Sequence, residues 1–468
     1  MIKKSIFMLL LFIILGLDQC YPELIPQPQN QVLHELGPFD KTDRVLILAP
    51  HPDDETIGCG GVIQQAKAQG AQVKIAYLTN GDHNEAAFII YEKRLVFRRK
   101  AFIYMGEVRR QEAIKAMNIL GVEKEDLYFL GYPDFGTFAI LNQYWDPQKP
   151  FWCVLCRISE VPYKDSVSYK APYVGQNILS DLRRIIVDYK PTKIFVSHPA
   201  DVNVDHKSLY LYLQIVLRGL GKEGFDPEVY PYLVHCSGWP LPRHLHPDLD
   251  LEPPKKFMDG QIHWLRDDLT PGQVKKKIQA MKCYKSQTMS SAFYLFSFVR
   301  KNELFGDYPV IHFKRDVVSK IKEPFFSDFI EMFAESNEME TAKKVNIGER
   351  EKVSYAVSEG NFLIRVEKLG KNNRSFNLLL YLFGYNSKTP FAKMPKIEAH
   401  IKGEKLIMLD KRRRINSKSV SLKLKPKELT LKIPLKILGD PDFLLSAIKI
   451  YGGDLPFDST GFRKIEIE

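Results

Sequence analysis

Short apolar segments alternate with longer segments of helical periodicity between Val45 and about Asp316, and this alternation limits the fold more than any other feature. The run Val45–Ala49 has no polar residue on either face, as expected of a strand buried on both sides. We predict further strands at 73–78, 127–130 and 193–197, and helices at 107–120 and 178–189. Strands separated by helices predict an α/β fold with a mostly parallel sheet and helices on both faces.

The pattern of apolar and polar residues changes beyond about residue 345. Short alternating segments follow one another there, separated by Gly, Pro, Asn or Lys; they lie at 362–366, 376–383, 397–401, 420–424, 429–433 and 447–451. This pattern is typical of an antiparallel β-sandwich. A chain of 468 residues is also too long for one ordinary domain. We therefore predict an α/β domain at 40–316, a linker at 317–344 and a C-terminal β-sandwich domain at 345–468.

The net charge of +11 comes from basic residues that are scattered among acidic and apolar positions. The densest basic cluster, Lys411–Arg414, lies between two alternating apolar stretches, where a solvated turn is the simpler interpretation. The charge pattern therefore predicts no nucleic acid partner.

The N-terminus has the pattern of a secretion signal. Lys3 and Lys4 precede a continuous apolar run, Ile6–Leu17, which is too short to span a bilayer comfortably. We predict that residues 1–20 are a signal peptide or N-terminal anchor that directs export across a bacterial inner membrane. The protein would then be periplasmic, on the cell surface or secreted. Cys20 leaves two outcomes open, cleavage of the signal or membrane association through a lipid at this residue.

The remaining cysteines include Cys153-Val-Leu-Cys156, which has the spacing of half a zinc site. The sequence contains no second Cys-x-x-Cys pair that could complete a four-cysteine zinc site. A disulfide or two ordinary thiols is therefore the prediction for this pair.

Two polar clusters follow predicted strands. His51, Asp53, Asp54 and Glu55 come directly after the first strand, and the segment 198–206 (HPADVNVDH) follows the strand at 193–197. Acids at the start of a helix could simply complement its dipole, but capping does not explain the histidines or the second cluster. Both clusters should lie at one edge of the sheet, where imidazoles and carboxylates would form a site for a borderline metal such as Zn²⁺.

These residues resemble the PIG-L/LmbE-like family of zinc-dependent deacetylases that act on N-acetylglucosamine-containing substrates. The resemblance covers about residues 43–305. It rests on His51-Pro-Asp-Asp-Glu55 with Gly60-Gly61, Thr79-Asn-Gly-Asp82, Arg109-x-x-Glu112, Leu130-Gly-Tyr-x-Asp134, the 198–206 segment, and Lys277-x-x-Ala280 before Ser286-Gln287. It implies a Rossmann-like fold and removal of the N-acetyl group by a metal-bound water, that is, hydrolysis of a linear amide C–N bond.

The resemblance also implies residue roles. His51, Asp54 and His206 would bind Zn²⁺, with Fe²⁺ or another divalent metal as the alternative. Asp53 would be the general base, and Asp205 would orient a metal ligand or the base.

Two further positions match residues that hold the sugar in relatives. These are Arg109 and Asp134, for which a buried Arg–Asp ion pair without substrate contact is the alternative interpretation.

Asn203 departs from the family pattern, because several relatives carry a histidine there. An asparagine can donate a hydrogen bond but cannot transfer a proton. The acid role could pass to protonated Asp53 or to His235, for which a structural role is the alternative.

The C-terminal domain resembles, over fewer residues, the family 9 carbohydrate-binding modules. The residues concerned are Met394-Pro-Lys-Ile397, Ile433-Pro-Leu435 with Leu438-Gly439, and Asp458-Ser-Thr-Gly-Phe462-Arg463. No Trp occurs after Trp264, so an indole platform for a sugar is missing. A sandwich that only packs on the catalytic domain is the alternative. For the whole chain, the alternatives to a sugar deacetylase are a hydrolase of another N-acyl amine and a carbohydrate-binding surface protein with little activity.

Overall fold

The structure is a computed structural model, and it describes residues 33–83, 99–221, 223–257, 262–314, 321–324, 352–367, 377–416, 418–425, 428–452 and 455–468. The predicted signal segment and most of the predicted linker lie outside these residues, so both stay predictions. Among the helices that are described, none combines the length and the apolar character needed to cross a bilayer.

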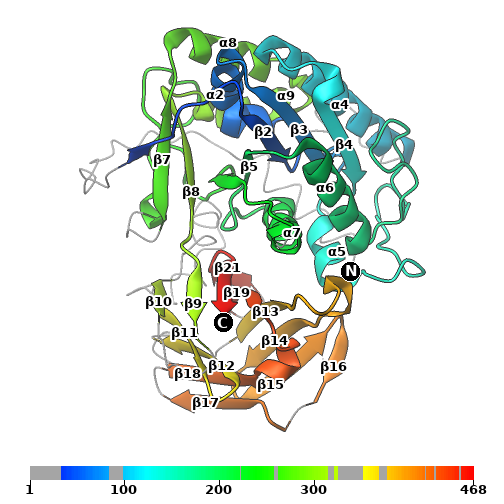
Figure 1. The fold of residues 1–468 in the computed structure, drawn as a ribbon, viewed down its shortest axis with the longest axis vertical. Helices are drawn as coiled ribbons and strands as arrows, with labels where there is room; N and C mark the ends of the chain where they lie inside the picture. The colour runs from blue at the N-terminus through cyan, green and yellow to red at the C-terminus, as the bar shows by residue number, and fades with distance from the viewer. Residues whose placement is uncertain are drawn as a thin grey trace.

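The N-terminal part of the chain is built on one mixed sheet (Figure 1). In spatial order its strands are β1 (His34–Glu35), β7 (His263–Asp268), β8 (Asn302–Asp307), β6 (Glu228–Tyr232), β5 (Lys193–Ser197), β2 (Arg44–Ala49), β3 (Gln72–Thr79) and β4 (Leu127–Tyr132). The five strands from β6 to β4 run parallel, whereas β8 pairs antiparallel with both β6 and β7. The predicted α/β fold with a mostly parallel sheet is confirmed.

Helices cover both faces of this sheet. They are α2 (Asp54–Ala68), α4 (Arg99–Leu120), α5 (Thr137–Gln143), α6 (Gly175–Tyr189), α7 (Val204–Gly221), α8 (Pro271–Met281) and α9 (Lys285–Leu295). Along β2, Val45 and Ile47 join the core that contains α2 residues, while Leu46 and Leu48 join the core that contains α6 and α7 residues. A strand that is buried on both faces needs the uniformly apolar run seen in the sequence. The predicted helix at 107–120 begins earlier, at Arg99.

The C-terminal part forms two sheets that share one apolar core. The smaller sheet contains β10 (Ile321–Pro324), β11 (Lys352–Ser358), β12 (Asn361–Glu367), β18 (Glu428–Pro434) and β17 (Ser421–Lys425). The larger contains β16 (Arg413–Ile415), β15 (Lys405–Asp410), β14 (Lys396–Lys402), β13 (Asn377–Tyr385), β19 (Phe443–Gly452), β21 (Arg463–Ile467) and β9 (Ile311–Phe313), with β20 (Leu455–Ser459) beside β19. Nearly all pairings are antiparallel, as predicted for a sandwich, and β9 with β21 is the parallel exception among the described pairs.

The boundary between the two parts is not where the sequence pattern changes. β9 lies within the segment predicted for the α/β domain, yet it is a strand of the larger C-terminal sheet. β10 lies within the predicted linker and pairs with β11. The alternation of apolar residues is too short in these three- and four-residue strands to be recognised from the sequence.

The two parts pack directly on each other through α5 (Figure 1). The ring of Phe138 on α5 lies 5.2 Å from that of Tyr381 and 5.9 Å from that of Phe462. Arg463, from the segment that resembles a carbohydrate-binding module, stacks over Tyr308 and is buried. Phe462 and Arg463 therefore serve the domain interface, which agrees with the packing interpretation of the sandwich.

Candidate active site

Both polar clusters lie at the carboxyl ends of neighbouring strands. β2 pairs parallel with β5, and the order of the strands along the chain reverses between these two. In open α/β sheets this reversal opens a crevice in which ligands bind. The clusters begin at Pro50 after β2 and at His198 after β5, so the prediction that they share one edge of the sheet is confirmed.

The loop after β2 holds Asp53 in an unusual conformation. The helix α2 begins at Asp54, and Asp53 precedes it with a φ of 126° and no side-chain capping hydrogen bond. A non-glycine residue in such a region costs on the order of 1–3 kcal/mol and is found mainly at functional sites. Asp54 and Glu55 lie in the first turn, where the helix dipole favours acids. Capping therefore explains part of the cluster but not Asp53.

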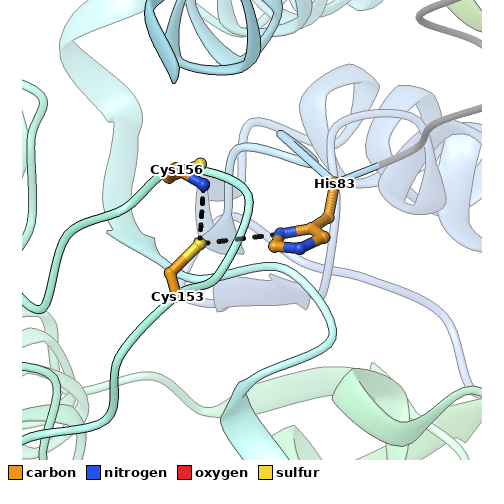
Figure 2. Close-up of side chains that lie close together, drawn as sticks. All are labelled: His83, Cys153 and Cys156. Carbon is orange, nitrogen blue, oxygen red and sulfur yellow. Dashed lines mark hydrogen bonds between the residues drawn. The ribbon is translucent and has the colours of Figure 1, made fainter. Parts of the chain in front are cut away.

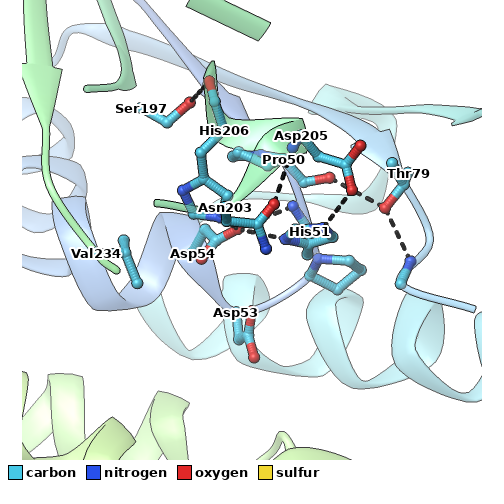
Figure 3. Close-up of polar contacts among 12 residues, drawn as sticks. Pro50, His51, Asp53, Asp54, Thr79, Ser197, Asn203, Asp205, His206 and Val234 are labelled. Carbon is cyan, nitrogen blue, oxygen red and sulfur yellow. Dashed lines mark hydrogen bonds and ion pairs between the residues drawn. The ribbon is translucent and has the colours of Figure 1, made fainter. Parts of the chain in front are cut away.

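The three predicted metal ligands converge on one point (Figure 3). Nδ1 of His51 and Nε2 of His206 each lie 3.1 Å from the same atom, Oδ2 of Asp54. All three side chains are buried. Two imidazole nitrogens and a carboxylate oxygen at this spacing could share a single cation.

The outward-facing nitrogens of both histidines meet carboxylates. Nε2 of His51 lies 3.0 Å from Asp134 and 3.3 Å from Asp205, and Nδ1 of His206 lies 3.0 Å from Asp201. A carboxylate behind a histidine fixes the ring and strengthens it as a metal ligand. Both nitrogens of His206 are buried without a hydrogen bond of good geometry to the described residues. The residues present therefore fit a metal ion, and the imidazole–carboxylate donor set is one that suits Zn²⁺.

The electrostatics of this cluster favour a positive charge. Burial alone would lower the pKa of His206, but the carboxylates of Asp201 and Asp54 raise it to about 9. The pKa of Asp54 is held well below its usual range, because His206 and His51 outweigh the effect of burial. A cluster that stabilises an extra proton on an imidazole would equally stabilise a cation in its place.

Asp53 lies beside the ligands but is not one of them, and its partner is Arg109. Nη2 of Arg109 lies 3.4 Å from Oδ1 of Asp53. Burial raises the pKa of Asp53 to about 8, although Arg109 opposes this. A carboxyl group that gains and loses its proton near neutral pH has the property needed in a general acid–base group.

The other hydrogen bonds of the Arg109 guanidinium go to backbone carbonyl oxygens. It donates to the carbonyl oxygens of Gly81 at 3.0 Å and Pro52 at 2.8 Å, and its side chain is buried. Gly81 has a φ of +65°, and a Cβ there would overlap the guanidinium. The guanidinium of Arg109 is thus held between these two carbonyl oxygens and the carboxylate of Asp53, and its predicted role in holding the sugar stays a prediction. Its ion pair is with Asp53, whereas Asp134 contacts His51.

Asp205 connects the second cluster to the loop after β4. Its carboxylate accepts hydrogen bonds from the backbone N–H groups of Phe135 at 2.6 Å and Thr137 at 3.2 Å, besides its contact with His51. The predicted role in orienting a ligand agrees with this geometry. Asn203 lies directly before α7, and its Oδ1 accepts from the N–H of Asp205 at 2.8 Å. This is a helix cap, so only the Nδ2 amide of Asn203 could donate to a substrate.

His235 lies against His206 with ring centroids 4.8 Å apart. Burial lowers the pKa of His235 to about 4. Its imidazole is therefore neutral at ordinary pH and carries no extra proton to give to a leaving amine. The geometry brings His235 into the site but favours Asp53 as the acid.

Two further acids, Asp201 and Glu55, contact the site residues, although no role was predicted for them from the sequence. Asp201 holds His206 and also accepts from the backbone N–H of His235 at 2.8 Å. Glu55 is fully buried, accepts from the hydroxyl groups of Tyr284 and Thr56, and accepts from the N–H of Asp53 at 3.0 Å. Both acids belong to the two polar clusters, and their positions in the sequence next to the predicted ligands could have indicated this role.

Comparison with known proteins supports this description. A family model described as PIG-L, GlcNAc-PI de-N-acetylase, matches residues 46–216. A 1D-myo-inositol 2-acetamido-2-deoxy-alpha-D-glucopyranoside deacetylase of Geodermatophilus obscurus is 38% identical over 113 residues, which are 23% of this chain and 36% of that protein. The protein of the same description from Kribbella flavida is 25% identical over 292 residues, 56% of this chain and 89% of the relative.

Among solved structures, an N,N'-diacetylchitobiose deacetylase from Pyrococcus horikoshii is similar with 18% identity and a TM-score of 0.32, over 52% of this chain and 70% of that one. The chain spans only 36% of the length of the first relative above. The matched segment, in contrast, runs from β2 through β5 into α7 and carries every predicted metal ligand. Residues 46–216, which are the larger part of the α/β domain, therefore match the model of the PIG-L family.

Proposed function

We propose that the protein hydrolyses the N-acetyl group of an N-acetylglucosamine-containing sugar or glycoconjugate and releases acetate. The observation that carries this proposal is the convergence of His51 and His206 on one oxygen of Asp54, with the carboxyl group of Asp53 beside them. The PIG-L domain and the described activity of the two curated relatives support the substrate class.

His51, Asp54 and His206 would hold a divalent cation, for which we propose Zn²⁺. When bound, such a cation polarises an amide carbonyl and makes a water molecule more acidic. Asp134, Asp205 and Asp201 keep the two imidazole rings in the orientation that this requires.

Asp53 would move the protons. Hydrolysis adds water to the carbonyl carbon, breaks the C–N bond, and leaves acetate and an amine that has gained a proton. Asp53 would take the proton from water and then give it to the departing nitrogen. Its burial and its raised pKa allow both states of the carboxyl group near neutral pH. Arg109 holds the charged form in place.

The Nδ2 amide of Asn203 would donate a hydrogen bond to the substrate carbonyl. Such a donor stabilises the negative charge that develops on the oxygen during attack.

Acetate release from a panel of N-acetylated compounds tests this proposal. The panel should contain N-acetylglucosaminyl-inositol, N,N'-diacetylchitobiose, N-acetylglucosamine and a simple N-acetyl amine without a sugar, each with and without a chelator. We expect release from at least one sugar and loss of release with the chelator. Turnover of the simple amine alone would move the assignment to hydrolysis of other N-acyl amines.

Export through residues 1–20 stays a proposal that rests on the sequence alone. Detection of the chain with Met1 intact in the soluble cytoplasm would contradict it.

A further inference from the structure

A second group of metal-ligating side chains lies outside the site described above (Figure 2). His83 follows β3, whereas Cys153 and Cys156 lie in a turn between α5 and α6. The ligand atoms of all three residues lie within 4.8 Å of one another. Segments far apart in the chain therefore bring an imidazole to a Cys-x-x-Cys turn.

Both sulfur atoms are buried, and neither cysteine forms a disulfide. The N–H of Cys156 donates to Sγ of Cys153 at 3.3 Å, and Nδ1 of His83 lies 3.8 Å from the same sulfur. Hydrogen bonds to sulfur favour the thiolate, which is the form that binds metals.

A buried carboxyl group, that of Asp82, belongs to the residue directly before His83. Asp82 is buried, and its Oδ2 accepts from the hydroxyl of Tyr163 at 2.7 Å. Its Oδ1 is also buried but has no hydrogen-bond partner among the described residues. An unpaired carboxylate oxygen next to two buried sulfurs is costly unless a cation neutralises the group.

The spacing fits a zinc ion. With Zn–S near 2.3 Å and Zn–N near 2.0–2.1 Å, tetrahedral coordination separates the sulfur and the nitrogen by about 3.6 Å. The observed distance between Sγ of Cys153 and Nδ1 of His83 is 3.8 Å. We propose that His83, Cys153 and Cys156 bind a second Zn²⁺ ion.

This second site would support the catalytic one. The backbone N–H of His83 donates to Oδ2 of Asp134 at 3.1 Å, and Oδ1 of Asp134 lies 3.0 Å from Nε2 of His51. A metal held by His83 and the two cysteines would tie the Cys-x-x-Cys turn to the end of β3 and fix Asp134. Binding would release the thiol protons, so affinity should fall at low pH.

Metal counting on the full chain, purified under reducing conditions, tests the proposal. We expect two zinc ions per chain in the wild type and one in His206→Ala, where only the thiolate site remains. Cys153→Ser/Cys156→Ser should retain one. Cys283→Ser is the matched control, since Cys283 is a partly exposed thiol outside both sites, and it should bind as the wild type does.

Cobalt replaces zinc and reports on the ligands. Cobalt-loaded His206→Ala should show the near-ultraviolet charge-transfer band of a thiolate–cobalt bond, and Cys153→Ser/Cys156→Ser should lack it. A metal-free His206→Ala chain with reduced cysteines, or a Cys153–Cys156 disulfide in the isolated protein, would overturn the proposal. If the double variant does not fold, the metal content and spectrum of His206→Ala still decide. None of these readouts depends on deacetylation, so the proposed function can fail separately.

Discussion

Replacement of Asp53 by Asn is the most informative single perturbation of the proposed chemistry. The amide has nearly the volume of the carboxyl group, and Arg109 keeps its hydrogen bonds to Gly81 and Pro52. Asp54 remains to bind metal. The variant should therefore fold and bind metal as the wild type does, while losing the group that takes up and donates the proton.

The size of the loss follows from the neighbouring groups, which are already engaged. The carboxylate of Glu55 accepts from Tyr284, Thr56 and the N–H of Asp53. His235 has a pKa of about 4 and is neutral, and the carboxylate of Asp205 is occupied by Phe135, Thr137 and His51. We expect turnover to fall by about 10²-fold or more, or about 2.7 kcal/mol in the activation free energy.

Steady-state acetate release, measured together with metal content, checks this expectation. Asp267→Asn is the matched control. Asp267 on β7 is also a buried carboxyl group with a pKa raised by burial to about 8, but it contacts none of the proposed ligands. The control should keep normal turnover. Near-normal turnover in metal-loaded Asp53→Asn would refute the role of Asp53 and direct attention to His235 or Asp205.

Three further predictions concern stability as well as activity. Asn203→Ala should lower turnover less than Asp53→Asn does, and loss of the α7 cap should destabilise the protein by about 1 kcal/mol. Asn203→Asp should restore stability but not turnover. If Asn203→Asp restores turnover together with stability, Asn203 has no separate catalytic role. The carboxyl group of Asp267 keeps its proton up to about pH 8 in the folded protein, whereas the unfolded chain releases it near pH 3.8. The free energy of unfolding should therefore fall as pH rises from about 4 to 8. Denaturant titrations of Asp267→Asn should show a weaker fall than those of the wild type. Phe462→Ala should lower the free energy of unfolding by about 3 kcal/mol, because its ring is buried between Phe138, Tyr381 and Phe383; an unchanged denaturation midpoint would show that the interface is not formed as described.

The fold and the position of the site were predictable because their signals are local. An apolar run such as Val45–Ala49 indicates a buried strand, and a polar cluster directly after it must lie at the end of that strand. The short strands β9 and β10 were not predictable, since three or four residues carry too little periodicity. Their assignment depends on pairing with β21 and β11, which are distant in the sequence.

The partners of the site residues were harder to predict than the ligands. Asp134 follows β4 and Arg109 lies on α4, and both reach the residues after β2 only in the folded chain. The cap made by Asn203 depends on where α7 begins. His83 lies seventy positions before Cys153, so the spacing Cys153-x-x-Cys156 alone left a disulfide or ordinary thiols as the simpler interpretation.

The proposed metal-dependent deacetylation is tested most directly by measuring acetate release and bound metal in the same samples of wild type and His206→Ala. The two nitrogens of His206 face the carboxylates of Asp54 and Asp201 in a buried site. We expect the wild type to release acetate from an N-acetylglucosamine-containing substrate, chelation to stop the release, and added zinc to restore it. We expect a folded His206→Ala protein to release none at any zinc concentration. Acetate release by His206→Ala at the wild-type rate, or a metal-loaded wild type that deacetylates no such substrate, would contradict the proposed function.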